Sequence, residues 1–100
     1  MLSITKTNEN GAAVFRLKGH LDTTTAPELD TELKSCIGDL KTLTLDMKEL
    51  DYVSSAGLRV ILSAQKIMNK QGEMKITNVN ETIREIFEVT GFSDILTIVP

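Results

Sequence analysis

The stretch DYVSSAGLRVIL, residues 51–62, joins a predicted strand to a predicted helix. Its small residues, Ser54 to Gly57, stand between these two elements. After Gly57, mostly apolar residues recur three or four positions apart, which predicts a helix over residues 55–71 that Gly72 ends. Its buried stripe is expected to contain Leu58, Val60, Ile61, Leu62, Ala64, Gln65 and Met68. The two serines leave three roles open: nucleophile, phosphate acceptor or helix cap.

The sequence before this stretch predicts a hairpin, a helix and a strand. Two short runs flank Asn10-Gly11, a dipeptide typical of tight hairpin turns, and predict strands over residues 2–8 and 12–19. The alternating run KTLTLDM predicts a strand over residues 41–47.

Between the hairpin and that strand, Leu29, Leu33 and Ile37 have helical spacing and predict a helix over residues 26–37. Its start is predicted to be a capping box of Thr25 and Glu28, and its stop Gly38.

The last third of the chain predicts a strand over residues 73–79, a helix and a final strand over residues 94–99. The helix follows Asn80 as its cap, ends at Gly91, and is expected to bury Ile83, Ile86 and Phe87. The element order predicts an α/β fold, one domain over residues 1–100, with a mixed sheet of about five strands and three main helices.

Composition narrows the class of protein. Apolar residues make up 41% and charged residues 25% of the chain, as in ordinary globular proteins, and no apolar run is long enough to span a bilayer. The opening residues do not resemble a signal peptide, so we expect a cytoplasmic location without a membrane partner. The net charge of -3 and the pI near 5.1 disfavour nucleic acid and favour a protein as partner.

Neither the only cysteine nor the only histidine predicts a disulfide, a metal site or a catalytic site. Cys36 has no second cysteine for a disulfide and no metal-ligand spacing, so we expect a small core residue on a helix. His20 follows Gly19 at a strand end, which indicates a loop position. The sequence therefore predicts no metal, no cofactor and no His-dependent catalytic triad.

On spacing alone, a helix cap is the favoured role for the serines, because serine is a preferred N-cap. A nucleophilic serine needs a nearby base, and SSAGL lacks the glycine spacing and lysine of a P-loop. Ser54 and Ser55 are nevertheless expected at the carboxyl edge of the sheet, where open α/β sheets place ligand sites. A phosphate at a helix start gains backbone hydrogen bonds and a favourable dipole.

Three segments, GHLDTTTAPELDTEL, LDYVSSAGLRVILSAQKIMNKQGEMKITNV and IREIFEVTGF, resemble the STAS domain of bacterial anti-sigma factor antagonists over nearly the whole chain. In that family a serine at this strand-to-helix junction is phosphorylated by a partner serine kinase. Matching the family's Gly-Leu to Gly57-Leu58 puts the acceptor at Ser55. Ser54 replaces the family's usual aspartate and is a secondary candidate.

The resemblance also implies a partner-binding surface that contains Asp22, Ser54, Ser55, Ala56, Gly57 and Arg59. Asp22 matches a family aspartate expected near the acceptor, although a turn aspartate that bonds local N–H groups is an equal alternative. The implied function is not enzymatic. Unphosphorylated protein would bind an anti-sigma factor that is also an ATP-dependent serine kinase, phosphorylation would release it, and a serine phosphatase would reset it.

Two alternatives remain open. One is a STAS subunit that regulates a transporter or sensory complex by binding, without phosphorylation. The other is a small enzyme or phospho-receiver with Asp46 or Asp51 as the reactive carboxylate. The second is disfavoured because a receiver needs an acidic pair after its first strand and a lysine late in the fold, and the segments MLSITKTNEN and DILTIV supply neither.

Overall fold

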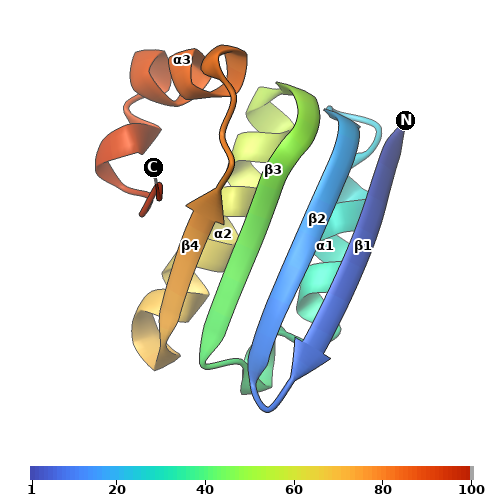
Figure 1. Ribbon diagram of the computed structural model, residues 1–100, viewed down its shortest axis with the longest axis vertical. Helices are drawn as coiled ribbons and strands as arrows, with labels where there is room; N and C mark the ends of the chain where they lie inside the picture. Colours follow the sequence, from blue (N-terminus) through green and yellow to red (C-terminus); the bar gives the residue numbers. More distant parts are fainter. Residues whose placement is uncertain (100) are drawn as a thin grey trace.

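The computed structural model describes residues 1–99 and places four strands in one sheet, in the order β1-β2-β3-β4 (Figure 1). Strand β1 is antiparallel to β2, and the other neighbours are parallel. The strands are β1 (Leu2–Glu9), β2 (Ala12–Leu21), β3 (Thr42–Val53) and β4 (Glu73–Thr77).

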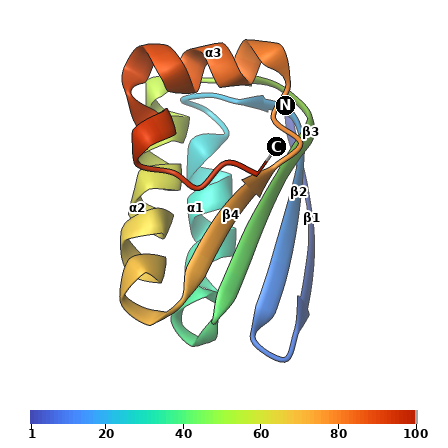
Figure 2. The ribbon, with the colours of Figure 1, turned by 60° about the vertical axis from the view of Figure 1, so that its left-hand side comes forward.

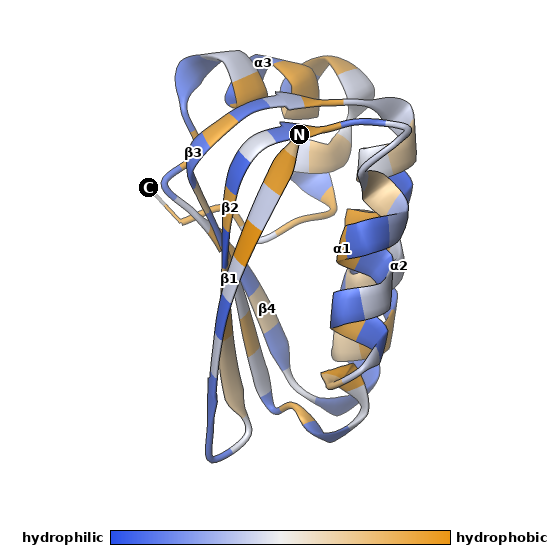
Figure 3. Cartoon of the chain, turned by 90° about the vertical axis from the view of Figure 1, so that its right-hand side faces the viewer, coloured by the Kyte–Doolittle hydropathy of each residue, from blue (hydrophilic) through white to orange (hydrophobic). Residues whose placement is uncertain are grey.

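Two helices, α1 (Ala26–Lys34) and α2 (Ser55–Gln71), cover one face of this sheet, as Figure 3 shows. The third helix, α3 (Glu81–Thr90), crosses the end of the sheet at which β3 finishes (Figure 2). Two short 3-10 helices, η1 (Ile37–Asp39) and η2 (Phe92–Asp94), complete the described elements. Within residues 1–99, no helix is both long enough and apolar enough to cross a membrane.

The hairpin and the last two helices agree with the sequence predictions. Asn10 and Gly11 both have positive φ, 53° and 82°, as a tight turn between β1 and β2 requires. Helix α2 has the predicted bounds. Asn80 caps α3, because its side-chain oxygen accepts a hydrogen bond from the Ile83 N–H at 2.9 Å.

The predicted helix over residues 26–37 is wrong at its end, because α1 stops at Lys34 and Gly38 lies inside η1. Its capping box is also wrong. Thr25 precedes the helix with a helical backbone conformation and makes no side-chain cap bond. Its hydroxyl instead donates to the His20 carbonyl oxygen at 2.8 Å, so this side chain joins the end of β2 to the start of α1.

Strand β3 runs six residues past the predicted end at residue 47, to Val53. Its register against β2 shifts twice, between Asp46 and Glu49 and between Leu50 and Tyr52. Each shift places one extra residue in β3, which moves the next inward side chain on by one. The buried positions are therefore Met47, Leu50 and Val53. Because they are three residues apart, this part of the strand lacks the alternation of apolar and polar residues that predicts a strand.

The predicted last strand over residues 94–99 is wrong, and the sheet has four strands rather than about five. Gly91 is followed by η2, which ends at Asp94, the first residue of the predicted strand. The segment after η2 pairs with β4 at one bridge, between Ile76 and Ile98. The Ile76 N–H donates to the Thr97 carbonyl oxygen and the Val99 N–H to the Ile76 carbonyl oxygen, both at 2.9 Å.

The core lies between the sheet and the helices. Ile61 of α2 and Phe87 of α3 are fully buried, and Ile83 is buried beside them, as predicted. Ile86 is only half-buried and packs at the margin, so its placement in the core was wrong. On α2, Val60 and Leu62 are also half-buried, at the sides of the buried stripe.

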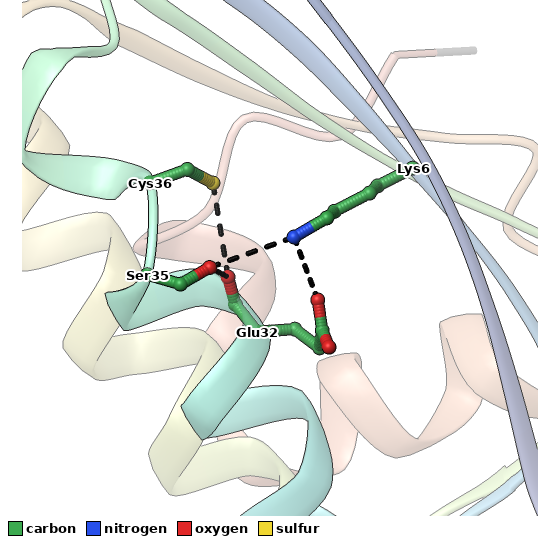
Figure 4. A network of polar contacts seen from close by, with 4 residues as sticks. All are labelled: Lys6, Glu32, Ser35 and Cys36. Atoms are coloured by element: carbon green, nitrogen blue, oxygen red, sulfur yellow. Dashed lines mark hydrogen bonds and ion pairs between the residues drawn. The ribbon is translucent and has the colours of Figure 1, made fainter.

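A polar network ties the edge strand β1 to the end of α1 (Figure 4). The Lys6 ammonium lies 2.7 Å from a Glu32 carboxylate oxygen and 3.5 Å from the Ser35 hydroxyl. The hydrogen bond to Glu32 raises the pKa of Lys6 above its usual value. Cys36, predicted in the core, is half-buried after α1, with its thiol 3.7 Å from the Glu32 carbonyl oxygen.

Candidate functional site

The parallel ends of β2 and β3 place the two segments of the predicted site side by side. Leu21 and Val53 are register partners, so Asp22 and Ser54 leave neighbouring strands at the same edge of the sheet. A hydrogen bond of 2.8 Å from the Ser54 N–H to the Leu21 carbonyl oxygen extends the pairing one residue further. This is the carboxyl edge at which the sequence predicted a site.

Ser54 is the cap of α2. Its backbone is extended, with φ -89° and ψ 173°, and its hydroxyl oxygen accepts a hydrogen bond from the Gly57 N–H at 3.2 Å. The Ser54 carbonyl oxygen also accepts the first helical bond, from the Leu58 N–H at 2.9 Å. The predicted role of helix cap therefore belongs to Ser54, and Ser55 is free of it.

Ser55 is the first residue of α2, and its side chain is exposed. Within the described residues, no hydrogen bond engages its hydroxyl. The only histidine, His20, does not supply a base for it. His20 lies in β2 rather than in a loop, and its ring packs edge-on against Tyr52, with centroids 6.4 Å apart. Ser55 is thus exposed at the helix start, and the described residues give it no partner that would activate it as a nucleophile.

Gly57 allows α2 to start close to β2. A Cβ atom at this buried position would lie 2.7 Å from Leu21 Cγ and 3.0 Å from the Leu21 carbonyl oxygen. Any larger residue would push the first turn of α2 outward. The close approach at Gly57 therefore sets the position of the first turn of α2, which contains Ser55.

Asp22 organises the turn between β2 and α1. Its Oδ1 atom accepts hydrogen bonds from the N–H groups of Thr24 and Thr25, both at 3.0 Å, and lies 3.2 Å from the Thr25 hydroxyl. The bond from the Thr25 N–H is the largest cause that lowers the pKa of Asp22 below its usual value of 3.8. Asp22 therefore has the structural role of a turn aspartate, and its second oxygen takes none of these bonds.

A shallow groove of about 290 Å³ separates the first turns of α1 and α2. Thr23, Ala26, Pro27 and Asp30 line one side, and Ala56, Arg59 and Val60 line the other. Ala56 and Val60 are half-buried, whereas Arg59 is exposed. The groove joins the two sequence segments that were predicted to form one surface.

The alternative reactive carboxylates lie elsewhere. Asp46 is in β3, where Oδ1 accepts hydrogen bonds from Asn78 Nδ2 and the Lys48 N–H, both at 3.0 Å. Asp51 is exposed near the end of the same strand. Among residues 1–99, no three His, Cys, Asp or Glu side chains gather into a group that could hold a metal ion.

Comparison with known proteins agrees with this arrangement. The family model described as the STAS domain matches residues 3–100. The chain belongs to the STAS domain family. BtrV of Bordetella bronchiseptica is 34% identical over 97 residues, covering 94% of this chain and 83% of BtrV. The anti-sigma-B factor antagonist of Bacillus subtilis is 33% identical over 94 residues, covering 93% of this chain and 85% of that protein.

The STAS fold is also shared with the solved structure of the Bacillus anti-sigma factor antagonist SpoIIAA. Its unphosphorylated form superposes with a TM-score of 0.83 at 19% identity, covering 98% of this STAS chain and 89% of SpoIIAA. Its phosphorylated form gives a TM-score of 0.77 with the same identity, covering 98% of this chain and 92% of the other.

The STAS chain brings together the residues that the sequence singled out, from Asp22 on one segment to Ser54–Gly57 and Arg59 on the other. Sequence reasoning missed two contributors at the same edge, Thr25 and Tyr52. The Thr25 hydroxyl bonds the preceding strand instead of capping α1, a contact between segments that spacing within one helix does not show. Tyr52 is 47% exposed although it is aromatic, because the second bulge of β3 turns it outward.

Proposed function

We propose that this chain is an anti-sigma factor antagonist whose binding to an anti-sigma factor is switched by phosphorylation of Ser55. The observation that carries the proposal is a difference between two serines. Ser54 caps α2, whereas Ser55 is exposed and its hydroxyl makes no hydrogen bond to the described residues. The names of the relatives, and a neighbour of this fold known in both phosphorylation states, support the same function.

The partner in this proposal is an anti-sigma factor that is also a serine kinase. The kinase transfers the γ-phosphoryl group of ATP to the Ser55 oxygen, the hydroxyl proton leaves, and ADP is the other product. A serine phosphatase hydrolyses the phosphoester and restores the binding form. Nucleotide and magnesium belong to the partner, and the proposed location is the cytoplasm, where sigma factors and ATP are found.

The switch arises from charge at an exposed helix start. Phosphorylation adds about 1.5 to 2 negative charges at neutral pH, which the amino end of α2 tolerates. An interface packed against a kinase that holds ATP is already anionic, and the added phosphate opposes binding there. A penalty of about 3 to 4 kcal/mol weakens binding by roughly two to three orders of magnitude.

The test incubates the protein with ATP and an anti-sigma factor kinase from the same organism, then maps the phosphopeptide. Ser55→Ala should abolish phosphorylation and leave partner affinity largely unchanged, whereas Ser55→Asp should weaken binding less than phosphate does. Ser54→Ala is the matched control and should keep both phosphorylation and binding. Phosphate on Ser54 alone would move the acceptor by one residue. No phosphate on either serine, with normal binding by Ser55→Asp, would refute the switch and favour a STAS subunit that acts by binding alone.

A further inference from the structure

Arg59 lies on the same side of α2 as the proposed acceptor. The two residues are four positions apart, so they stand about 40° from each other around the helix and about 6 Å apart along it. Side chains with this spacing are neighbours on a helix surface. Long helical side chains also lean toward the amino end of their helix, so Arg59 covers the turn in which Ser55 lies.

The Arg59 guanidinium has no ion-pair partner among the described residues, in which five ion pairs involve other side chains. Arg59 lines the groove together with Ala56 and Pro27. The acidic residue of the groove, Asp30, is engaged by Lys34 at 2.9 Å. Among the described residues, Arg59 is therefore a cation without an ion-pair partner that lines the groove, four positions after the proposed acceptor.

We propose that Arg59 binds the phosphate of phosphorylated Ser55, and that the same guanidinium contacts a carboxylate of the partner when Ser55 is unmodified. This inference rests on the proposed function. A guanidinium presents five N–H donors in a planar fork that suits both anions, and a phosphate monoester is the more highly charged of the two. Phosphorylation then removes a favourable contact from the interface in addition to adding repulsion.

The other cations of α2 provide an internal control. Lys66 and Lys70 are exposed on the same helix, but Lys66 is eleven residues from Ser55, or about 16 Å along the axis. An exposed charge at that distance is beyond the screening length of about 8 Å at physiological salt. Lys66→Gln therefore removes the same charge from the same helix without touching the proposed pair.

The first measurement needs neither kinase nor partner. Phosphoserine is introduced at position 55 by semisynthesis, and phosphorus NMR follows its second ionisation with pH. Arg59→Gln should raise the apparent pKa of the phosphate by about half a pH unit, because the dianion loses its cation. Lys66→Gln should leave it unchanged, and Arg59→Lys should restore part of the shift. Equal apparent pKa values of the phosphate in Arg59→Gln and Lys66→Gln would refute the contact between Arg59 and the phosphate.

The second measurement compares partner affinity for four proteins: wild type and Arg59→Gln, each with and without the phosphate. Unphosphorylated Arg59→Gln should bind about tenfold more weakly than wild type, and its further loss on phosphorylation should be smaller than the wild-type loss. Equal losses of affinity on phosphorylation in wild type and Arg59→Gln would refute the proposal that Arg59 leaves the partner's carboxylate for the phosphate. If the anti-sigma factor did not bind wild type at all, the proposed function would fail, while the NMR titration would still decide the pair.

Discussion

At the scale of single residues, two adjacent serines differ in their bonding: Ser54 caps α2, whereas Ser55 does not, and the sequence leaves this difference unresolved. Spacing within SSAGL favours a cap without saying which serine supplies it. The answer depends on where β3 ends. Because the second bulge extends that strand to Val53, Ser54 is the first residue outside it and Ser55 the first inside α2.

The cap and the acceptor can be separated by stability measurements. Ser54→Ala should lower the free energy of unfolding by about 1 kcal/mol, because the Gly57 N–H loses its side-chain acceptor. Ser55→Ala, at an exposed position without a hydrogen bond, should change it by less than about 0.5 kcal/mol. Urea denaturation of the two variants checks this, and the reverse order would assign the cap to Ser55.

Asp22 predicts a dependence of stability on acid pH. Its pKa is lowered in the folded state by the bonds from Thr25 and Thr24, so its carboxylate favours folding above the ordinary value of 3.8. That contribution is lost as the pH falls through the folded-state pKa. Asp22→Asn should therefore be less stable than wild type at pH 6, and the difference should shrink below about pH 3.8.

Denaturation midpoints at a series of pH values test this dependence. Asp51→Asn, which removes an exposed carboxylate of β3, is the control and should follow the wild-type profile. A constant difference between Asp22→Asn and wild type down to pH 2 would show that the charge of Asp22 does not support the turn.

At the scale of elements, helices α2 and α3 were predictable because their caps and stripes lie within one contiguous segment. Strand β3 and the last segment were not, because their form depends on partners far away in sequence. The extra residues in β3 appear only against β2, and residues 97–99 pair with the short strand β4 at a single bridge. Helical periodicity also could not show that α3 lies across the sheet end, which leaves Ile86 at the margin of the core.

The depth of each helix in the core can be measured by truncation. Ile61→Ala should cost about 2 to 5 kcal/mol of unfolding free energy, because Ile61 is fully buried. Ile86→Ala should cost less than half as much, since its side chain is already partly hydrated. Val89→Ala, at a position 82% exposed, is the control and should change stability by less than about 0.5 kcal/mol. A cost for Ile86 equal to that for Ile61 would contradict the position of α3.

At the scale of the whole molecule, the candidate site lies at one end of the sheet, above buried residues of the core. Leu21, Val53, Leu58 and Ile61 are buried directly beneath the two segments that carry the exposed residues. The resemblance of three motifs was enough to predict the fold class, because those motifs are the segments that meet at this edge, and Ser55 as the acceptor stays a prediction. The groove was not predictable, since it depends on how closely Gly57 lets α2 approach β2.

This arrangement predicts that phosphorylation changes the surface and leaves the fold unchanged. Ser55 is exposed at the start of α2, so a phosphate there displaces no buried group and breaks no hydrogen bond of the cap. In amide NMR spectra, the shifts caused by phosphoserine at position 55 should be confined to the ends of β2 and β3 and the first turns of α1 and α2. The β1–β2 turn at Asn10 and Gly11, at the opposite end of the sheet, serves as the internal reference (Figure 1). Shifts that extended to this turn would mean that the switch acts through a rearrangement of the whole domain.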